Sequence, residues 1–256
     1  MLALERLPLS DELAMLVPVP GCAQAGGAVG SREVIEDQPG REVAFEPLLD
    51  QLAELFDPDR APWGPWPDGH EPDWYERCES KRLAIAHAAA QDLDGVREHA
   101  GLVLDAIVHD TNRSGNRQLV QVALRALGAR AVLETLIGFV ESGNATERIG
   151  AAMAMYWARP AVAYDLREVH EHRAEIEAAN RDLVDVRGRA NQACLRAFLG
   201  TGDPALRADL SLCFTLDTGS YPPEWAADLT RAIEIALADR DRYNRLLRTL
   251  PSGQAA

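Results

Sequence analysis

Between Asn116 and Trp157 the apolar residues recur three times in succession with the spacing of an α-helix. The first run occupies positions i, i+3, i+4, i+7 and i+8, one face of a helix with about 3.6 residues per turn, and it consists of Leu119, Val122, Ala123, Ala126 and Leu127. Half-buried strands alternate at every second residue instead. This stretch therefore predicts consecutive short helices, each with one buried face, and the rest of the chain can be laid out around it.

Glycines divide the three runs. Gly128 ends the first helix, and Gly143 with Asn144 closes the second, where we expect the left-handed C-terminal conformation that favours glycine. The second run contains Val132, Leu133, Leu136, Ile137 and Val140. The third run follows Arg148 and contains Ile149, Ala152, Met153 and Tyr156.

Apolar periodicity and capping residues predict further helices on both sides of this stretch. Asp73 and Glu76 resemble a capping box, with an acid in place of the usual hydroxyl, and Asp203-Pro204 pairs an N-cap with a first-turn proline. In all we expect roughly nine to eleven helices and no confident strand. The remaining helices are expected at residues 2–17, 47–57, 73–89, 96–107, 160–180, 185–194, 203–214 and 224–238.

The most distinctive composition lies between Asp57 and Trp74, where five prolines forbid regular structure through most of the segment. Trp63 and Trp66 lie within it. Two interpretations remain open: the tryptophans form an aromatic contact surface for a partner, or they pin an irregular loop onto the end of a helical stack. Residues 17–40 are rich in glycine and proline, and we expect a loose segment there.

These features predict three parts: an acidic N-terminal extension with the Pro/Trp-rich loop at residues 1–72, a helical domain at residues 73–250 and a frayed tail at residues 251–256. The net charge is −14, and residues 1–72 hold 14 acidic and 4 basic residues. Such a balance works against binding through phosphate groups, so we expect neither nucleic acid nor a membrane as a partner. Of the 26 basic residues, 25 are arginine, a bias expected of a GC-rich bacterial genome.

The cysteines indicate neither a zinc ribbon nor a dithiol redox motif, because no CxxC spacing occurs among Cys22, Cys78, Cys194 and Cys213. The first residues lack the basic and then apolar order of a secretory signal. No run approaches the roughly 18 apolar residues of a membrane span. We therefore expect a cytoplasmic protein with free thiols.

The segment Ala126–Leu136 resembles the turn of a HEAT or armadillo-type repeat, and Arg148–Ala152 resembles the opening of the next repeat. Weaker copies occur at Val186–Ala190 and Leu206–Ala208. The resemblance covers residues 73–220 and implies an all-α, α-solenoid-like stack of antiparallel helix pairs with a partner-binding concave face, in which acidic and arginine residues at helix starts link neighbouring repeats. The copies are about 29, 39 and 20 residues apart, where this class has about 40 to 47, so a non-repetitive helical bundle stays open as an alternative.

No convergent set of catalytic groups is evident. The densest group of metal-ligand types, at residues 168–175, places His170 and His172 on different faces of a helix, so only single pairs such as Glu168 with His172 share a face. No GxSxG, GxGxxG or GxxxxGKS motif occurs. We therefore expect no catalytic residue, no metal ion and no cofactor.

We also considered a DNA glycosylase built from helical repeats, which needs a basic concave face. One strip of arginines could supply local positive charge, but the negative net charge of the chain disfavours binding to duplex DNA. The strip consists of Arg113, Arg117, Arg125 and Arg130.

The function expected on this basis is that of a non-catalytic scaffold that binds another protein. Its partner contacts are expected at Trp63, Trp66, Trp74, Arg82, Arg148 and Arg187. We expect the three arginines to be exposed along one edge of the stack. Salt bridges between neighbouring repeats would account for their presence equally well. The alternative is a small-ligand-binding protein or enzyme with a pocket between helices, built from residues such as Trp157, Tyr164 and His170. A bundle that serves oligomeric assembly is a third interpretation.

Overall fold

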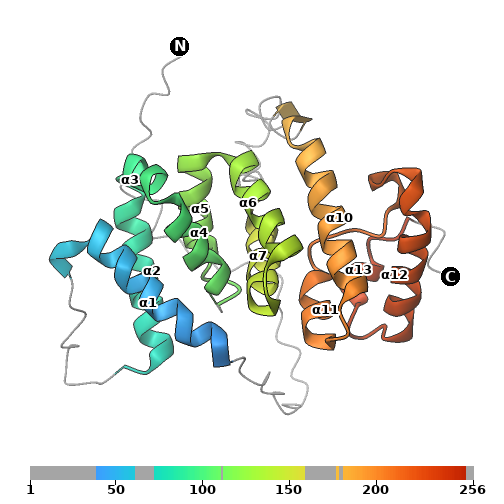
Figure 1. Ribbon diagram of the computed structural model, residues 1–256, viewed down its shortest axis with the longest axis horizontal. Helices are drawn as coiled ribbons and strands as arrows, with labels where there is room; N and C mark the ends of the chain where they lie inside the picture. Colours follow the sequence, from blue (N-terminus) through green and yellow to red (C-terminus); the bar gives the residue numbers. More distant parts are fainter. Residues whose placement is uncertain (1–38, 61–71, 111, 159–176, 179–180, 252–256) are drawn as a thin grey trace, which may run out of the picture. The chain divides into compact units, whose positions relative to one another are not determined.

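The computed structural model describes residues 39–60, 72–110, 112–158, 177–178 and 181–251. The chain divides into two compact units, Met1–Asp37 and Gln38–Ala256, and every described residue belongs to the second. Within the described ranges this unit consists of eleven α-helices with short 3₁₀ turns and no strand (Figure 1). The prediction of an all-α fold with roughly nine to eleven helices is confirmed.

The helices follow the chain in pairs joined mostly by short turns (Figure 1). The 3₁₀ turns are η2 (Pro58–Arg60), η4 (Thr218–Ser220) and η5 (Pro223–Trp225). The α-helices are α1 (Pro39–Phe56), α2 (Trp74–Ala89), α3 (Leu93–Glu98), α4 (Ala100–His109), α5 (Arg117–Leu127), α6 (Ala129–Ser142), α7 (Ala145–Trp157), α10 (Val184–Gly200), α11 (Pro204–Leu210), α12 (Ala226–Ala238) and α13 (Asn244–Leu247).

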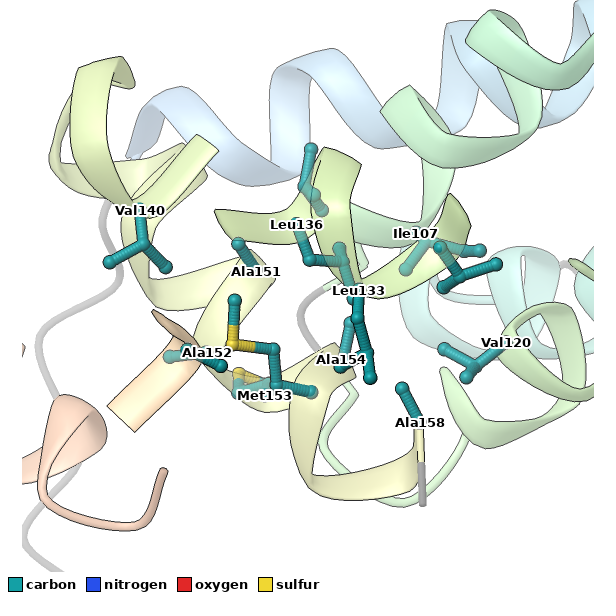
Figure 2. Packing of buried hydrophobic residues seen from close by; sticks show 14 of the residues in the cluster. Ile107, Val120, Leu133, Leu136, Val140, Ala151, Ala152, Met153, Ala154 and Ala158 are labelled. Carbon is teal, nitrogen blue, oxygen red and sulfur yellow. The ribbon is translucent and has the colours of Figure 1, made fainter. Parts of the chain in front are cut away.

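The periodic stretch folds as three helices, as its spacing predicts. All five predicted positions of α6 are buried, because its apolar residues lie on one face. On α7 the predicted face is too narrow: Tyr156 is exposed, whereas Ala151 and Ala154 are buried as well. Figure 2 shows why, since side chains of α4, α5 and α6 surround α7 in this part of the core.

The two glycines between these helices act differently. Gly128 has φ +82°, a conformation that favours glycine, and it ends α5 as predicted. The prediction of a left-handed residue at Gly143 is wrong, because this residue is extended at φ −70° and ψ 164°. A Cβ there would crowd the carbonyl oxygen of Phe139 and the side chain of Glu147, so Gly143 is required for space.

Helix α1 begins earlier than predicted. The sequence places Pro47 in a first helical turn, but the helix starts at Pro39 and Pro47 lies inside it. Phe45, before the proline, is buried together with Leu49, so burial of the upstream turn overrides the local preference of proline. The expected loose segment is therefore wrong at Pro39 and Gly40, which are helical; residues 17–38 lie outside the described residues, as does the predicted helix at residues 2–17.

Helix α2 begins as predicted. Asp73 accepts a hydrogen bond from the Glu76 amide at 2.8 Å, and Glu76 accepts one from the Asp73 amide at 3.2 Å, which completes the capping box. Ile85 of this helix is buried in the core, whereas Leu83 is exposed.

The single helix predicted across Val96–Ile107 is two helices, α3 and α4, because His99 leaves the helical conformation at φ −105° and ψ 26°. The helix predicted at residues 224–238 begins as the 3₁₀ turn η5 and continues as α12, and the separate short helix α13 follows it.

Charged side chains join α1 to α2. Arg77 donates two hydrogen bonds to the Glu46 carboxylate, Nε to Oε1 at 3.1 Å and Nη2 to Oε2 at 3.2 Å. Lys81 Nζ donates to the same Oε1 at 2.9 Å. The Arg77 guanidinium, more than any other group, holds the pKa of Glu46 below its ordinary value of 4.5, while burial opposes the shift.

The helices contact one another in two series. In the first, α1 contacts α4, α4 contacts α7 and α7 contacts α11; in the second, α2 contacts α5, α5 contacts α6, α6 contacts α10 and α10 contacts α12. Contacts between α1 and α2, α4 and α5, α6 and α7, and α10 and α11 join the two series. Among the described helices, none is long and apolar enough to cross a membrane.

Candidate partner-binding surface around the α4–α5 loop

The loop between α4 and α5 contacts side chains from α2, α7 and α11, all distant in sequence. We call Asp110 and Asn112–Asn116 the α4–α5 loop; Thr111 lies outside the described residues. Asp110 begins the loop and is fully buried. A buried carboxylate needs a partner, and the partner here comes from α2.

Arg82 of α2 supplies that partner. Its Nη1 donates to both oxygens of Asp110, at 3.1 and 3.2 Å, its Nε donates to Gln118 Oε1 at 3.3 Å, and its Nη2 pairs with Glu79. Arg82 is only 1% exposed. The expectation that Arg82 lies on an exposed ridge is therefore wrong: the guanidinium is buried because Asp110 and Glu79 compensate its charge.

Gly115 makes room for this guanidinium. A Cβ at residue 115 would overlap the Nη2 and Cζ atoms of Arg82. The loop and the buried ion pair therefore depend on each other, since a larger residue at this point displaces the group that neutralises Asp110.

Asn112 holds the loop in shape and connects it to the start of α2. Its Oδ1 accepts hydrogen bonds from the amides of Ser114 and Gly115, at 2.9 and 2.8 Å. Its Nδ2 donates to Tyr75 Oη at 2.7 Å and to Glu79 Oε2 at 3.0 Å. The Tyr75 ring is thus oriented by the loop while remaining exposed.

Arg113 connects the loop to α7 and α11, which belong to the first contact series. Its guanidinium pairs with Asp209 of α11, which is buried. Its carbonyl oxygen accepts a hydrogen bond from Nε1 of Trp157, at the end of α7, at 2.8 Å. The indole is thereby oriented by backbone of the same loop that orients Tyr75.

The aromatic ridge is the name we give to Tyr75, Arg117, Tyr156 and Trp157, which border the α4–α5 loop. Tyr156 packs edge-to-face on Trp157 with ring centroids 4.8 Å apart, and the Arg117 guanidinium lies 5.6 Å from the Trp157 ring centroid. Tyr75 is 53% exposed and Tyr156 is 45% exposed. The ridge therefore presents aromatic surface and a cation that are held in place by hydrogen bonds and ring contacts.

Of the remaining residues predicted to contact a partner, the described ones lie on three different helices. Trp63 and Trp66 lie outside the described residues, and Trp74 is the first residue of α2, half-buried against the core and next to Tyr75. Arg148 lies on α7 and donates from Nη2 to the carbonyl oxygen of Glu141 at 3.4 Å. Arg187 is half-buried on α10. The structure does not test whether any of these residues binds a partner, and their binding role stays a prediction.

Sequence reasoning missed Tyr75, Asn112 and Asp209. Tyr75 directly follows the Pro/Trp-rich segment that ends at Trp74, and no local pattern distinguishes it from the tryptophans. Asn112 and Asp209 carry no local signal, since their importance lies in contacts 37 and 96 residues away along the chain. Burial of Asp110 is what places the loop, and it is visible only in the folded protein.

Acidic and histidine side chains near this end of α4 do not converge on a metal position. Burial, more than any other cause, raises the pKa of Asp105 above its ordinary value of 3.8, and Nδ1 of His109 lies 2.8 Å from the Asp105 carbonyl oxygen. In the ranges that the structure describes, no group of three or more His, Cys, Asp or Glu side chains is placed to hold a metal ion. Of the residues predicted to line a pocket, Tyr164 and His170 lie outside the described residues, so the pocket stays a prediction; Nε1 of Trp157 donates to the Arg113 carbonyl oxygen.

Comparison with known proteins gave no relative: no protein-family model, no curated protein and no solved structure matches the chain. The functional argument therefore depends on this chain's own residues.

Proposed function

We propose that the protein is a non-catalytic, HEAT-like helical-repeat scaffold that binds another protein through the aromatic ridge. The observation that carries the proposal is the ridge itself. Tyr75, Tyr156 and Arg117 are exposed and Trp157 is half-buried. Hydrogen bonds from one loop orient Tyr75 and Trp157, and Tyr156 and Arg117 pack on the Trp157 ring. Tyr, Trp and Arg are the residue types that dominate binding energy at protein interfaces.

Two series of helix contacts support the repeat arrangement. Helices of a stack contact one another within a layer, and α1, α4, α7 and α11 make such a series, as do α2, α5, α6, α10 and α12, although α5 and α6 are consecutive helices joined by Gly128. The short turns at Gly128 and at Asp203-Pro204 suit antiparallel helix pairs.

Ion pairs between α6 and α10 also support this arrangement. Arg130 makes two hydrogen bonds of 2.8 Å to Asp185, and Arg189 donates to Glu134 at 2.7 Å. Arg130 and Asp185 both lie in the first turns of their helices, so the two helices begin side by side and run in the same direction. Acidic and arginine residues at helix starts that link neighbours are what the HEAT resemblance implies.

Preorganisation favours the ridge as a binding surface. Side chains that are already held in one rotamer lose less conformational entropy when a partner binds. Tyr75 is held by Asn112 and Trp157 by Arg113, so their rings are oriented before binding.

Charge favours a protein partner over nucleic acid. Two arginines of the predicted basic strip are neutralised in the fold, Arg113 by Asp209 and Arg130 by Asp185. With a net charge of −14, phosphate neutralisation supplies little binding energy.

The test compares a ridge variant with a matched control. The ridge variant carries Tyr75→Ala and Tyr156→Ala; the control carries Leu55→Ala and Leu237→Ala, which remove exposed apolar side chains from α1 and α12. Circular dichroism and melting curves first establish that both variants fold. Each protein is then used as bait in native cell lysate, and any retained protein is purified and its affinity for all three baits is measured by calorimetry.

A partner whose affinity falls at least about ten-fold for the ridge variant, but not for the control, supports the proposal. A partner that binds both variants equally well contradicts the ridge as the contact surface. Retention of a metabolite with no protein contradicts the scaffold function itself.

A further inference from the structure

The hydrogen-bond acceptors around the α4–α5 loop are engaged inside the fold. Asn112 Oδ1 accepts from the amides of Ser114 and Gly115, and the Arg113 carbonyl oxygen accepts from Nε1 of Trp157. The neighbouring Glu79 carboxylate pairs with Arg82 and accepts from Asn112 Nδ2. Each of these acceptors is therefore already bonded to a donor of the same chain.

The aromatic ridge, in contrast, presents donors. Tyr75 Oη accepts a hydrogen bond from Asn112 Nδ2 at 2.7 Å, so the O–H hydrogen of the tyrosine itself remains to donate outward from this exposed side chain. The exposed Arg117 guanidinium carries several N–H donors and no acceptor. A partner that suits the ridge therefore supplies hydrogen-bond acceptors.

The ridge also presents aromatic planes at two orientations. The rings of Tyr156 and Trp157 meet at 85° with their centroids 4.8 Å apart, and the Tyr156 side chain is exposed. The Tyr75 ring lies on the other side of the loop, on α2. Exposed aromatic rings of this kind are what the rings of a proline-rich segment pack against.

We propose that the partner segment bound by the ridge is a proline-rich peptide in the polyproline II conformation with an acidic residue at one end, an inference that rests on the proposed function. Proline has a carbonyl acceptor and no amide donor. The polyproline II helix contains no internal hydrogen bonds, so its carbonyl oxygens can accept from Tyr75 and Arg117. Such a peptide is extended before it binds, so it loses little conformational entropy on a ridge that is itself preorganised.

The acidic end of the peptide lies at Arg117. This arginine is the first residue of α5, and the first turn of the helix contains no acidic side chain. Asn116, the N-cap residue, makes no side-chain capping hydrogen bond. A carboxylate of the partner at this position is attracted both by the guanidinium and by the positive end of the helix dipole. The charge therefore fixes the direction in which the peptide runs along the ridge.

The experiment titrates the full chain into three fluorescent synthetic peptides and measures binding by anisotropy. The first peptide has about ten prolines followed by two aspartates, which is roughly three turns of polyproline II. The second replaces the aspartates by lysines, and the third replaces the prolines by glycine and serine. We expect the proline–aspartate peptide to bind at least about ten-fold more tightly than either of the others.

Variants of the ridge assign the contacts. Tyr75→Ala with Tyr156→Ala should weaken binding of the proline–aspartate peptide at least about ten-fold, and Leu55→Ala with Leu237→Ala should leave it unchanged. Tyr75→Phe keeps the ring and removes the O–H donor, so it should weaken binding about five-fold. Arg117→Gln should abolish the preference for aspartate over lysine. Melting curves establish that each variant is folded.

The proposal is overturned if the proline–aspartate peptide does not bind, if the glycine–serine peptide binds equally well, or if the ridge variant binds the peptide as tightly as the unmodified protein. A preference for aspartate that persists in Arg117→Gln overturns the position of the acidic end. The scaffold function fails separately: if a protein captured from lysate needs the ridge while the proline–aspartate peptide does not bind, the proposed function stands and the proline-rich partner alone is excluded.

Discussion

The ion pair of Arg82 and Asp110 shows how single residues decide local structure in this protein. Both side chains are removed from water, so each is tolerable only in the presence of the other. The pair orients the α4–α5 loop, and that loop orients Tyr75 and Trp157 through Asn112 and Arg113. A residue that never reaches the surface thus positions the surface on which the proposed function depends.

Gly115→Ala is expected to lower the free energy of unfolding by about 1 to 3 kcal/mol, because the new Cβ displaces the Arg82 guanidinium from Asp110. Chemical denaturation measures the effect. Gly101→Ala on α4, where a Cβ meets nothing within 4 Å, serves as the control and is expected to show no loss. In a background with Arg82→Met and Asp110→Asn, the loss should disappear. An equal loss in both backgrounds would show that the guanidinium is not the cause.

At the scale of elements, close backbone approach decides which helices touch. A Cβ on Gly150 of α7 would overlap the carbonyl group of Val108 on α4. Glycine at this point lets the two helices approach more closely than any larger residue permits, and Ala151, Ala152 and Ala154 continue the small surface of α7 (Figure 2). The helix is consequently buried on most of its circumference.

Gly150→Ala is therefore expected to destabilise the fold by about 3 kcal/mol, since a backbone carbonyl cannot move away without separating α4 from α7. Gly138→Ala on α6 is the matched control. It is also a helical glycine, but a Cβ there meets nothing within 4 Å, so it should stabilise by about 0.5 to 1 kcal/mol through helix propensity. The changes in the free energy of unfolding of both variants are measured from denaturant midpoints. We expect the two changes to have opposite signs; changes of the same sign would contradict the close approach of α7 to α4.

At the scale of the whole described unit, the C-terminal helices depend on fewer neighbours than the centre. α7 contacts helices of both series, whereas α13 is attached mainly through α12. One polar contact closes this end: the Leu216 amide donates to Thr249 Oγ1 at 2.8 Å, and that hydroxyl donates to the Leu246 carbonyl oxygen at 2.7 Å. Local opening is therefore expected to begin at α12 and α13.

Thr249→Val should accelerate amide hydrogen exchange in α12 and α13 by about five-fold, because a lost hydrogen bond and an unpaired buried amide cost about 1 kcal/mol. Exchange in α4 and α7 should not change. Thr135→Val is the control, since the Thr135 hydroxyl bonds only within its own helix, to the Ala131 carbonyl oxygen at 3.0 Å. Uniform acceleration across all helices would contradict an independent opening of this end.

The sequence by itself determined the helices wherever the signal is local. The apolar face of α6, the end of α5 at Gly128 and the capping box of α2 all follow from residues within one or two turns of each other. Propensity, periodicity and capping act over that range, so a single chain segment contains the whole of the information.

Tertiary structure alone decided what depends on distant neighbours. Helix α1 runs through Pro47 because Phe45 is buried. Arg82 is internal because Asp110, 28 residues away along the chain, pairs with it. A residue becomes buried only when the helices assemble. Removal from water stabilises apolar faces that pack together, and it destabilises a charged group unless that group is paired. The aromatic ridge around the α4–α5 loop also depends on contacts between residues distant in sequence, so no local sequence pattern predicts it.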